Sequence, residues 1–293
     1  MATRTLAQVL PAMPTSDGAG VKLRRSIGAR QTLRLDPFLM LDEFSSEVAD
    51  DYIAGFPSHP HRGFETVTYM LDGHMQHRDH LGNTGDLVPG AVQWMTAGRG
   101  IVHSEMPQQS EGRMRGFQLW INLPAKEKMK PAGYRDIRPE EIPVVAQPDG
   151  TRVKVIAGTF LHDGTAVDGA INPSSQRTST DPSYLDVVLA PGGAFEHRVD
   201  PAYNAFVYVY EGTVAVGPED APASLRAHEA GLLSPGERIA LRAGSAAARA
   251  IVLAARPLRE PVVQYGPFVM NTREEIEQAL LDYQRGEFTR AGA

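Results

Sequence analysis

Hydrophobic residues along this chain occur in short runs that alternate with polar residues and end at glycine or proline. Alternation with a period of two places every second side chain on the same face of an extended strand. The 28 Gly and 22 Pro are spread through the sequence and separate runs that are rich in β-branched and aromatic residues. Many short strands joined by tight turns indicate an all-β sandwich or barrel.

The first half of the chain contains a dense group of these runs. Two residue pairs that favour tight turns, Asp72-Gly73 and Ala97-Gly98, close the first two runs, and we expect a hairpin at Asp72-Gly73. The expected strands are FETVTYML (64–71), VQWMT (92–96), IVHSEM (101–106) and GFQLWINL (116–123).

The composition changes after Leu123. The stretch PAKEKMKPAGYRDIRPEEIP (124–143) is rich in proline and charge and lacks period-two alternation, which suits an exposed connection between domains. We therefore place a domain boundary near Lys130, between residues 1–130 and residues 131–293.

Strand patterns resume in the second half with a similar rhythm. Without a close sequence repeat, they are consistent with a second barrel related to the first. The expected strands lie within TRVKVIAGTF (151–160), YLDVVLA (184–190), AFVYVYEG (205–212), AGLLSPGERIAL (230–241) and AAARAIVLAA (246–255).

One helix is predicted near the end of the chain. Thr272 and Glu275 have the spacing of a capping box, and Ile276, Leu280 and Tyr283 follow at helical spacing. A glycine after this stripe is a stop signal. We expect the apolar stripe to pack on a sheet.

Composition narrows the classes of function. The chain has 293 residues, 29 Lys and Arg against 35 Asp and Glu, and no basic run, so we do not expect direct nucleic-acid binding. It has no cysteine, which excludes disulfides, thiolate metal sites and cysteine nucleophiles. No apolar run approaches the ~20 residues of a membrane span, and we see no secretory signal, so we expect a soluble cytoplasmic protein.

Two pairs of residues with metal-binding side chains stand out. In an extended strand, residues two apart point the same way with Cα atoms ~6.6 Å apart, so His59 and His61 could reach one metal ion. His103 and Glu105 form a second such pair and share parity with Ile101, so we expect them to face the barrel interior.

Together the two pairs offer three imidazoles and one carboxylate. This mixed set suits one divalent transition metal, Fe(II) first, with Mn, Ni, Cu, Co or Zn as alternatives, whereas a closed structural zinc site is disfavoured without thiolates. The competing interpretation is that His-x-His arises by chance and that His103 is a structural histidine.

Glu65 is a rival fourth ligand because it shares the parity of His59 and His61. A straight strand would carry it ~20 Å from His59, so Glu65 could return only if Arg62-Gly63 turn the chain. We rank it second to Glu105.

The remaining histidines give weaker signals. His74, His77 and His80 are three residues apart, a spacing that does not keep side chains on one face of a strand, so we expect a solvated hairpin there. Surface or capping roles are expected for the isolated residues His162, His197 and His228. No pair in the second half completes a ligand set, so only the first barrel is expected to hold metal.

Four apolar residues near the proposed ligands could line a pocket, or could equally belong to an ordinary core. They are Phe56, Trp94, Met95 and Met106.

Taken together, four stretches resemble the pirin family of the cupin superfamily. They are RLDPFLMLDEF, FPSHPHRGFETVTYMLDG, HRDHLGNTGDLVPGAVQWMTAGRGIVHSEMP and EPVVQYGPFVMNTREEIEQALLDYQRGEF. The resemblance implies a bicupin of two stacked antiparallel β-barrels, with a metal-binding N-terminal cupin, a metal-free C-terminal cupin and a short C-terminal helix. Its motif implies His59, His61, His103 and Glu105 as ligands, and it favours Glu105 over Glu65. His80 departs from the small hydroxyl residue expected at its position, which puts substrate preference in doubt.

Bacterial members of this family resemble quercetin 2,3-dioxygenases, which open the central ring of a flavonol with O2 and release CO. The resemblance thus implies a metal-dependent dioxygenase acting on a small aromatic substrate, with Glu105 able to take the proton of the flavonol hydroxyl. The alternative is a non-enzymatic, metal-dependent and redox-sensing cofactor that binds a transcription factor or a metabolic enzyme. For that role, the net charge of −6 favours contact with protein rather than DNA.

Overall fold

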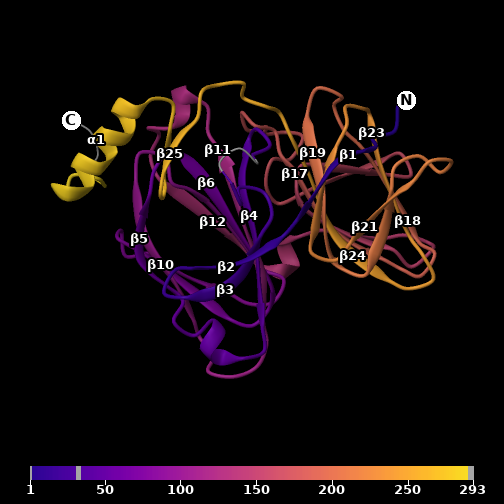
Figure 1. The fold of residues 1–293 in the computed structure, drawn as a ribbon, viewed down its shortest axis with the longest axis horizontal. Coiled ribbons are helices and arrows are strands. Elements are labelled where there is room, and N and C mark those ends of the chain that lie inside the picture. The colour runs from indigo at the N-terminus through magenta and orange to yellow at the C-terminus, as the bar shows by residue number, and fades with distance from the viewer. Residues whose placement is uncertain (1, 31–33, 290–293) are drawn as a thin grey trace. The chain divides into compact units, whose positions relative to one another are not determined.

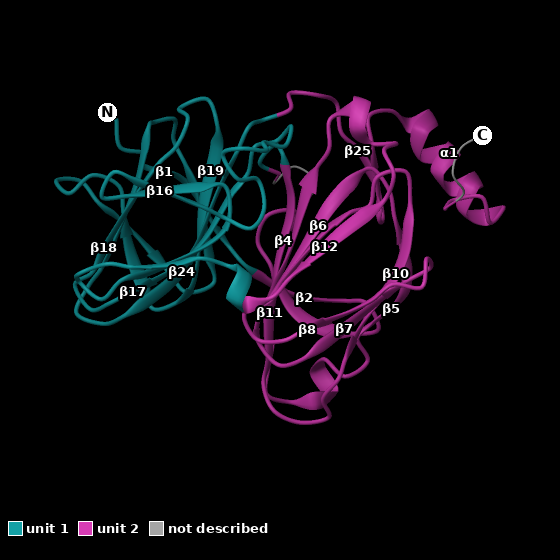
Figure 2. Ribbon diagram, turned by 180° about the vertical axis from the view of Figure 1, so that it is seen from behind, with its two compact units in different colours: residues 1–12, 35–37, 140–257 teal, residues 13–34, 38–139, 258–293 magenta. Residues whose placement is uncertain are grey.

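The computed structural model describes residues 2–30 and 34–289. It divides into two compact units, coloured separately in Figure 2. We call the unit of residues 13–34, 38–139 and 258–293 the N-terminal barrel. The unit of residues 1–12, 35–37 and 140–257 is called the C-terminal barrel. Each combines a seven-stranded sheet, a four-stranded sheet and a two-stranded sheet.

The named strands of the N-terminal barrel pair antiparallel, and Figure 1 shows this unit. Its large sheet has the order β12 (Gly133–Ile137), β9 (Val92–Thr96), β6 (Phe64–Asp72), β11 (Met114–Asn122), β4 (Phe38–Ser46), β3 (Val21–Arg25) and β2 (Met13–Asp17). Its small sheet has the order β5 (Phe56–His61), β10 (Ile101–Pro107), β7 (Met75–Asp79) and β8 (Thr84–Leu87). The two-stranded sheet pairs β25 (Val263–Tyr265) with β26 (Phe268–Met270).

The C-terminal barrel repeats this plan. Its large sheet has the order β1 (Leu6–Pro11), β22 (Glu229–Leu233), β19 (Asn204–Glu211), β24 (Ala248–Ala255), β17 (Ser183–Leu189), β14 (Arg152–Ala157) and β13 (Val144–Ala146). Its small sheet has the order β18 (Ala194–Arg198), β23 (Arg238–Ala243), β20 (Thr213–Val216) and β21 (Ala223–Arg226). β15 (Thr159–His162) pairs with β16 (Thr165–Asp168).

The described residues also form short 3-10 turns. Two of them, η1 (Ala49–Asp51) and η2 (Ala125–Glu127), belong to the N-terminal barrel, and η3 (Pro139–Glu141) lies where the chain passes to the C-terminal barrel.

The predicted all-β bicupin architecture is confirmed, and each expected run contains a strand. The turn at Asp72-Gly73 differs from the expectation. Gly73 has a φ of 90°, as a tight turn requires, but β6 before it lies in the large sheet and β7 after it in the small sheet. The pair therefore joins two sheets and does not close a hairpin. The prediction was wrong because a period-two pattern indicates that a strand exists but does not show which strand it pairs with.

The charged stretch after Leu123 was expected to be an exposed connection, and this is wrong for part of it. β12 lies inside this stretch and pairs with β9 in the large sheet. The Lys128 side chain is buried, and its ammonium donates to the Gly63 carbonyl at 2.7 Å, to Asn122 Oδ1 at 2.6 Å and to the Val269 carbonyl at 2.9 Å. A lysine can be buried when all three of its donors find acceptors, and composition alone does not reveal these partners.

The predicted helix is confirmed as α1 (Arg273–Gln284). Thr272 accepts a hydrogen bond from the Glu275 backbone while the Glu275 side chain accepts one from the Thr272 backbone, so the capping box is complete. Ile276 and Leu280 pack with Phe268 of β26. The apolar stripe thus covers the small β25–β26 sheet. None of the described helices is long and apolar enough to cross a membrane.

The two barrels differ in their interiors. The C-terminal barrel is filled by one large cluster of buried aliphatic side chains together with Phe160 and Phe195. In the N-terminal barrel, a smaller cluster around Phe44, Met70 and Met114 leaves a cavity of about 730 Å³. All the residues that line this cavity belong to the N-terminal barrel.

Candidate metal centre

Strands β5 and β10 bring the predicted histidines together. They pair antiparallel, with His59 opposite His103 and His61 opposite Ile101. Burial alternates along β10, so that Ile101, His103 and Glu105 are buried while Val102 is partly exposed. The expectation that His103 and Glu105 share the inward face with Ile101 is confirmed.

The three imidazoles form a compact group. One ring nitrogen from each of His59, His61 and His103 lies within 4.8 Å of the other two. The ring centroids are 4.7 Å apart for His59 and His61, 4.4 Å for His59 and His103, and 4.9 Å for His61 and His103. This group could hold a metal ion.

The hydrogen bonding of these rings fits a metal ion. Nδ1 of His59 lies 2.7 Å from the Pro57 carbonyl and must donate to it, which leaves Nε2 with a free lone pair. Nε2 of His103 is buried without a hydrogen-bond partner, and the two buried ring nitrogens of His61 have no partner beyond a weak contact with the Pro267 backbone. Unpaired buried polar atoms are costly, and a coordinated cation would satisfy them.

Electrostatics also favours the ligand form of these rings. Burial, with His59 as a second cause, lowers the pKa of His61 well below its usual range. Burial, followed by the neighbouring His61, does the same to the pKa of His103. Metals bind the neutral imidazole, so the environment holds these side chains in the form that can coordinate.

Glu105 lines the same cavity but lies outside the three-histidine group. The β5–β10 register shifts between His103 and Glu105, which places Glu105 opposite Phe56. Its buried carboxylate accepts a hydrogen bond from Gln118 Nε2 at 3.3 Å, and it shares the single proton of the Thr68 hydroxyl, 2.9 Å away, with Gln118 Oε1 at 2.6 Å. The bulge and these two side chains set the orientation of the carboxylate.

Glu65, the rival ligand, is engaged elsewhere. Its carboxylate accepts hydrogen bonds from the Trp94 indole at 3.0 Å and from the Thr96 hydroxyl at 2.6 Å, and Lys130 lies 3.5 Å away. These contacts account for its burial without a metal, in agreement with its lower rank.

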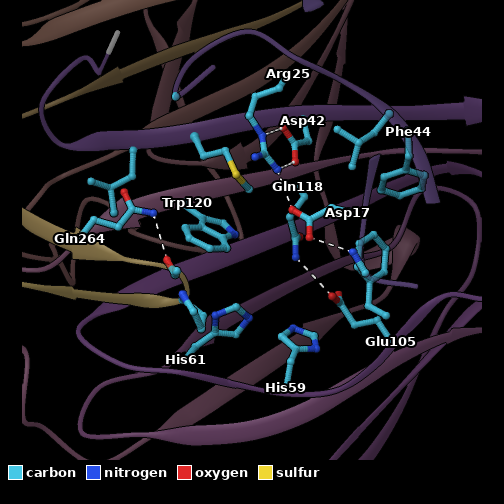
Figure 3. Close-up of a pocket in the computed structure, with 18 of the residues that line it drawn as sticks. Asp17, Arg25, Asp42, Phe44, His59, His61, Glu105, Gln118, Trp120 and Gln264 are labelled. Atoms are coloured by element: carbon cyan, nitrogen blue, oxygen red, sulfur yellow. Dashed lines mark hydrogen bonds and ion pairs between the residues drawn. The ribbon is translucent and has the colours of Figure 1, made fainter. Parts of the chain in front are cut away.

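The cavity is lined by polar and apolar side chains that alternate around it (Figure 3). Arg25 donates to both oxygens of Asp42 at 2.7 Å, and Gln118 lies between this ion pair and Glu105. Trp120 stands edge-on to His61, with ring centroids 5.3 Å apart. The apolar side chains of the lining are Leu23, Leu39, Met40, Phe44, Phe56 and Trp120.

Of the four residues that could wall the pocket, only Phe56 is among its lining residues. Trp94 is buried with its indole bound to Glu65, and Met95 packs in a separate core cluster. Met106 is partly buried on β10 but is not among the lining residues. The other aromatic lining residues are Phe44 of β4 and Trp120 of β11. The order of the strands in the sheets brings them to this cavity, and hydrophobic runs in the sequence do not specify that order.

His77 contradicts the prediction of a solvated hairpin. It is fully buried on β7, and its Nδ1 lies 3.1 Å from Nδ1 of His103. Burial is the largest cause lowering the pKa of His77. The available signal was its parity with Met75, which places both residues on the inward face of a short strand.

The other histidines divide between surface and core. His80 is exposed, and the partly exposed His74 lies 2.9 Å from Asp86. His162 and His228 are partly exposed, as expected for surface positions. His197 does not fit that expectation, because it is buried in the C-terminal barrel and its Nε2 lies 3.1 Å from the Ser183 hydroxyl.

Comparisons with known proteins agree with this architecture. The chain matches the Pirin family model over residues 20–121 and the Pirin C-terminal cupin domain over residues 184–289. It is 57% identical over 274 residues to a Pseudomonas aeruginosa protein named "Putative quercetin 2,3-dioxygenase", covering 93% of this chain and 94% of that one. It is 48% identical over 288 residues to a pirin-like protein of Caulobacter vibrioides, covering 98% of this chain and all of the other.

A solved structure extends the comparison to three dimensions. The crystal structure of quercetin 2,3-dioxygenase from Acinetobacter baumannii superposes with a TM-score of 0.85 at 33% identity, covering 98% of this chain and 99% of that one. Three findings agree: the two matched family models, the 57% and 48% identity to relatives over almost the whole chain, and the three-histidine group on β5 and β10. We conclude that this chain belongs to the pirin family of the cupin superfamily.

Proposed function

We propose that this protein is a metal-dependent dioxygenase that opens the central ring of a flavonol of the quercetin type with O2 and releases CO. The observation that carries the proposal is the three-histidine group beside a cavity of about 730 Å³ that both aromatic and polar side chains line. Sites for small organic ligands are concave, largely apolar and about 300–1,000 Å³ in volume. The similarity to proteins named for this activity supports the same reaction.

The proposed ligands are His59, His61, His103 and Glu105. Nitrogen and carboxylate donors suit a divalent transition ion, of which we propose Fe(II) first and Mn, Ni, Cu, Co or Zn as alternatives. When bound, such an ion would acidify a hydroxyl group of the substrate and supply a position for O2.

Glu105 is the group that can accept the proton of the flavonol 3-hydroxyl. Its carboxylate is buried and lines the same cavity as His59 and His61. Gln118 donates a hydrogen bond to one oxygen and the Thr68 hydroxyl lies 2.9 Å from the other, which keeps the carboxylate aimed while leaving further lone pairs for a substrate hydroxyl.

The cavity walls can orient a flat, hydroxylated aromatic molecule. Trp120, Phe44 and Phe56 provide aromatic surface, and the Arg25–Asp42 pair and Gln118 provide hydrogen-bonding groups among them. The apolar surface also limits water at the reacting carbon atoms.

The test is anaerobic loading with Fe(II), followed by addition of O2 and quercetin, with O2 uptake, CO release and loss of flavonol absorbance measured together. We expect turnover in the native protein and none in His61→Ala, which should lose the metal. Glu105→Gln keeps the three imidazoles and should retain metal but turn over about 10²–10⁴-fold more slowly, the usual contribution of a general base. No turnover with any of the six divalent metals would overturn the proposal.

The regulatory alternative remains a prediction with a different readout. It requires a protein partner that co-purifies with the metal-loaded chain and dissociates from His59→Ala or after oxidation. Partner capture of this kind, without flavonol consumption by the same preparation, would replace the dioxygenase proposal with the regulatory one.

A further inference from the structure

We propose that His77 is a positioning residue for the metal centre, which accepts the Nδ1 proton of His103 and so holds His103 in the tautomer whose Nε2 can coordinate. The proposal rests on the metal centre proposed above. His77 lies on β7, where the register places it opposite Glu105 of β10. It was expected to lie in solvent, yet neither His77 nor His103 is more than 1% exposed.

The contact between the two rings limits where their protons can be. Two Nδ1 atoms 3.1 Å apart attract each other only if one carries a proton and the other offers a lone pair. In the first arrangement His103 donates to His77, and Nε2 of His103 is left with a lone pair. In the second arrangement His77 donates, and His103 carries its own proton on Nε2, which blocks coordination.

The two arrangements place the second proton in different surroundings: the carboxylates of Glu105, Asp136 and Asp79 act on His77, whereas the charged neighbours of His103 are other histidines. In the first, the second proton of the pair sits on Nε2 of His77, and in the second it sits on Nε2 of His103. Both of these atoms are buried without a hydrogen-bond partner. A cation at the three-histidine group can be held only by the first arrangement, so metal binding selects the tautomers of both rings.

Tyr134 packs against the other side of this contact. Its ring lies edge-on to His77, with centroids 5.1 Å apart and an interplanar angle of 64°, an arrangement that aromatic pairs prefer and that helps to fix the His77 ring. The chain thus provides a sequence of contacts from Tyr134 through His77 to His103.

The choice of an imidazole as acceptor has a chemical consequence. Metal-bound histidines commonly donate their second N–H to a carboxylate or a carbonyl, and a carboxylate makes the imidazole a stronger electron donor. A neutral imidazole withdraws the proton less strongly, so His103 remains a neutral ligand. The ion then keeps more of its positive charge, which favours the acidification of a coordinated hydroxyl group.

The experiment measures metal affinity by competition with a chelator, using Zn(II) and Ni(II), in three variants of the full chain. His77→Leu has no acceptor and should bind both ions about 10–100-fold more weakly, the usual effect of losing such a partner. His77→Gln places an amide oxygen within reach of Nδ1 and should recover most of the affinity. His197→Leu removes another buried histidine, in the C-terminal barrel, and should leave the affinity unchanged.

A second measurement reports the tautomer directly and does not depend on any variant folding. Long-range ¹H–¹⁵N NMR of the Zn(II)-loaded native protein should show His103 protonated at Nδ1 and His77 protonated at Nε2. The proposal is overturned if His103 is protonated at Nε2, or if His77→Leu binds both ions as tightly as the native protein. Neither readout requires flavonol turnover, so an inactive but metal-binding protein would refute the dioxygenase and leave this inference standing.

Discussion

At the scale of single residues, His197 shows what burial does to an imidazole away from the candidate metal centre. It lies in the C-terminal barrel near Phe160 and Phe195, with ring centroids 5.9 Å and 6.4 Å away. Desolvation lowers its pKa to about 4, from an ordinary value of 6.5. The folded protein therefore keeps this side chain neutral over a pH range in which the unfolded chain protonates it.

This difference predicts a loss of stability in mild acid. Below pH 6.5 the unfolded state binds a proton at His197 that the folded state does not bind until about pH 4, so the free energy of unfolding falls as pH falls between these values. The contribution of His197 is about 2 kcal/mol between pH 7 and pH 5. Urea unfolding of the metal-free protein should show that His197→Leu loses less stability over this interval by about that amount. Equal losses in the two proteins would contradict the assigned cause.

The inward-facing residues of one strand were predictable from its own sequence. Parity with Ile101 was sufficient to place His103 and Glu105 on the buried face of β10. The contact of His77 with His103 was not predictable in this way, because it depends on β7 pairing with β10 across the small sheet. To predict a contact between residues of two strands, one must know the order of the strands in the sheet, and the period-two pattern does not contain that information.

At the scale of elements, the turn between β5 and β6 is fixed by a strand from the far end of the sequence. Gly63 follows the ligand strand directly and has a φ of 90°. An added Cβ there would overlap the Val269 carbonyl oxygen of β26. Arg62 forms a bridge with Phe268 of the same strand. The local sequence raised a turn at Arg62-Gly63 only as a condition for Glu65 to approach the histidines, and it gave no sign of the distant strand that requires a glycine.

Gly63→Ala should therefore destabilise the protein more than a left-handed backbone alone explains. Gly82 gives a matched control, because it has a φ of 85° and open space around its Cα. Gly82→Ala should cost about 1–3 kcal/mol, the usual cost of a strained backbone position. Gly63→Ala should cost more and should also weaken Zn(II) binding, because His61 precedes the displaced turn. Equal unfolding free energies for the two variants would show that β26 does not constrain this turn.

Strand existence and strand pairing were predictable to different degrees. The alternating runs located the strands around the metal centre, including β6, β9, β10 and β11. They did not show that β1 pairs with β22 in the C-terminal barrel, or that β12 extends the large sheet of the N-terminal barrel. Such long-range pairings depend on burial between segments far apart in the chain, for which the local pattern carries no signal.

At the scale of the whole molecule, the chain exchanges its ends between the two units. Residues 1–12 belong with residues 140–257, whereas residues 258–293 belong with residues 38–139. The domain boundary near Lys130, between residues 1–130 and residues 131–293, remains a prediction. The grouping does place the three histidines, Glu105 and the whole cavity within one unit.

Metal binding should therefore stabilise the two units unequally. A ligand that binds only the folded state stabilises it by about 2.7 kcal/mol at a free concentration 100 times the dissociation constant. Hydrogen exchange with and without saturating Zn(II) should show added protection in β5, β10 and β11 of the N-terminal barrel. Peptides from β17 and β24 should show little change, because the aliphatic core of the C-terminal barrel contains none of the proposed ligands. His61→Ala should lose the added protection, which ties it to the three-histidine group. Equal protection in β17 and β24 would mean that the two units open as one cooperative body.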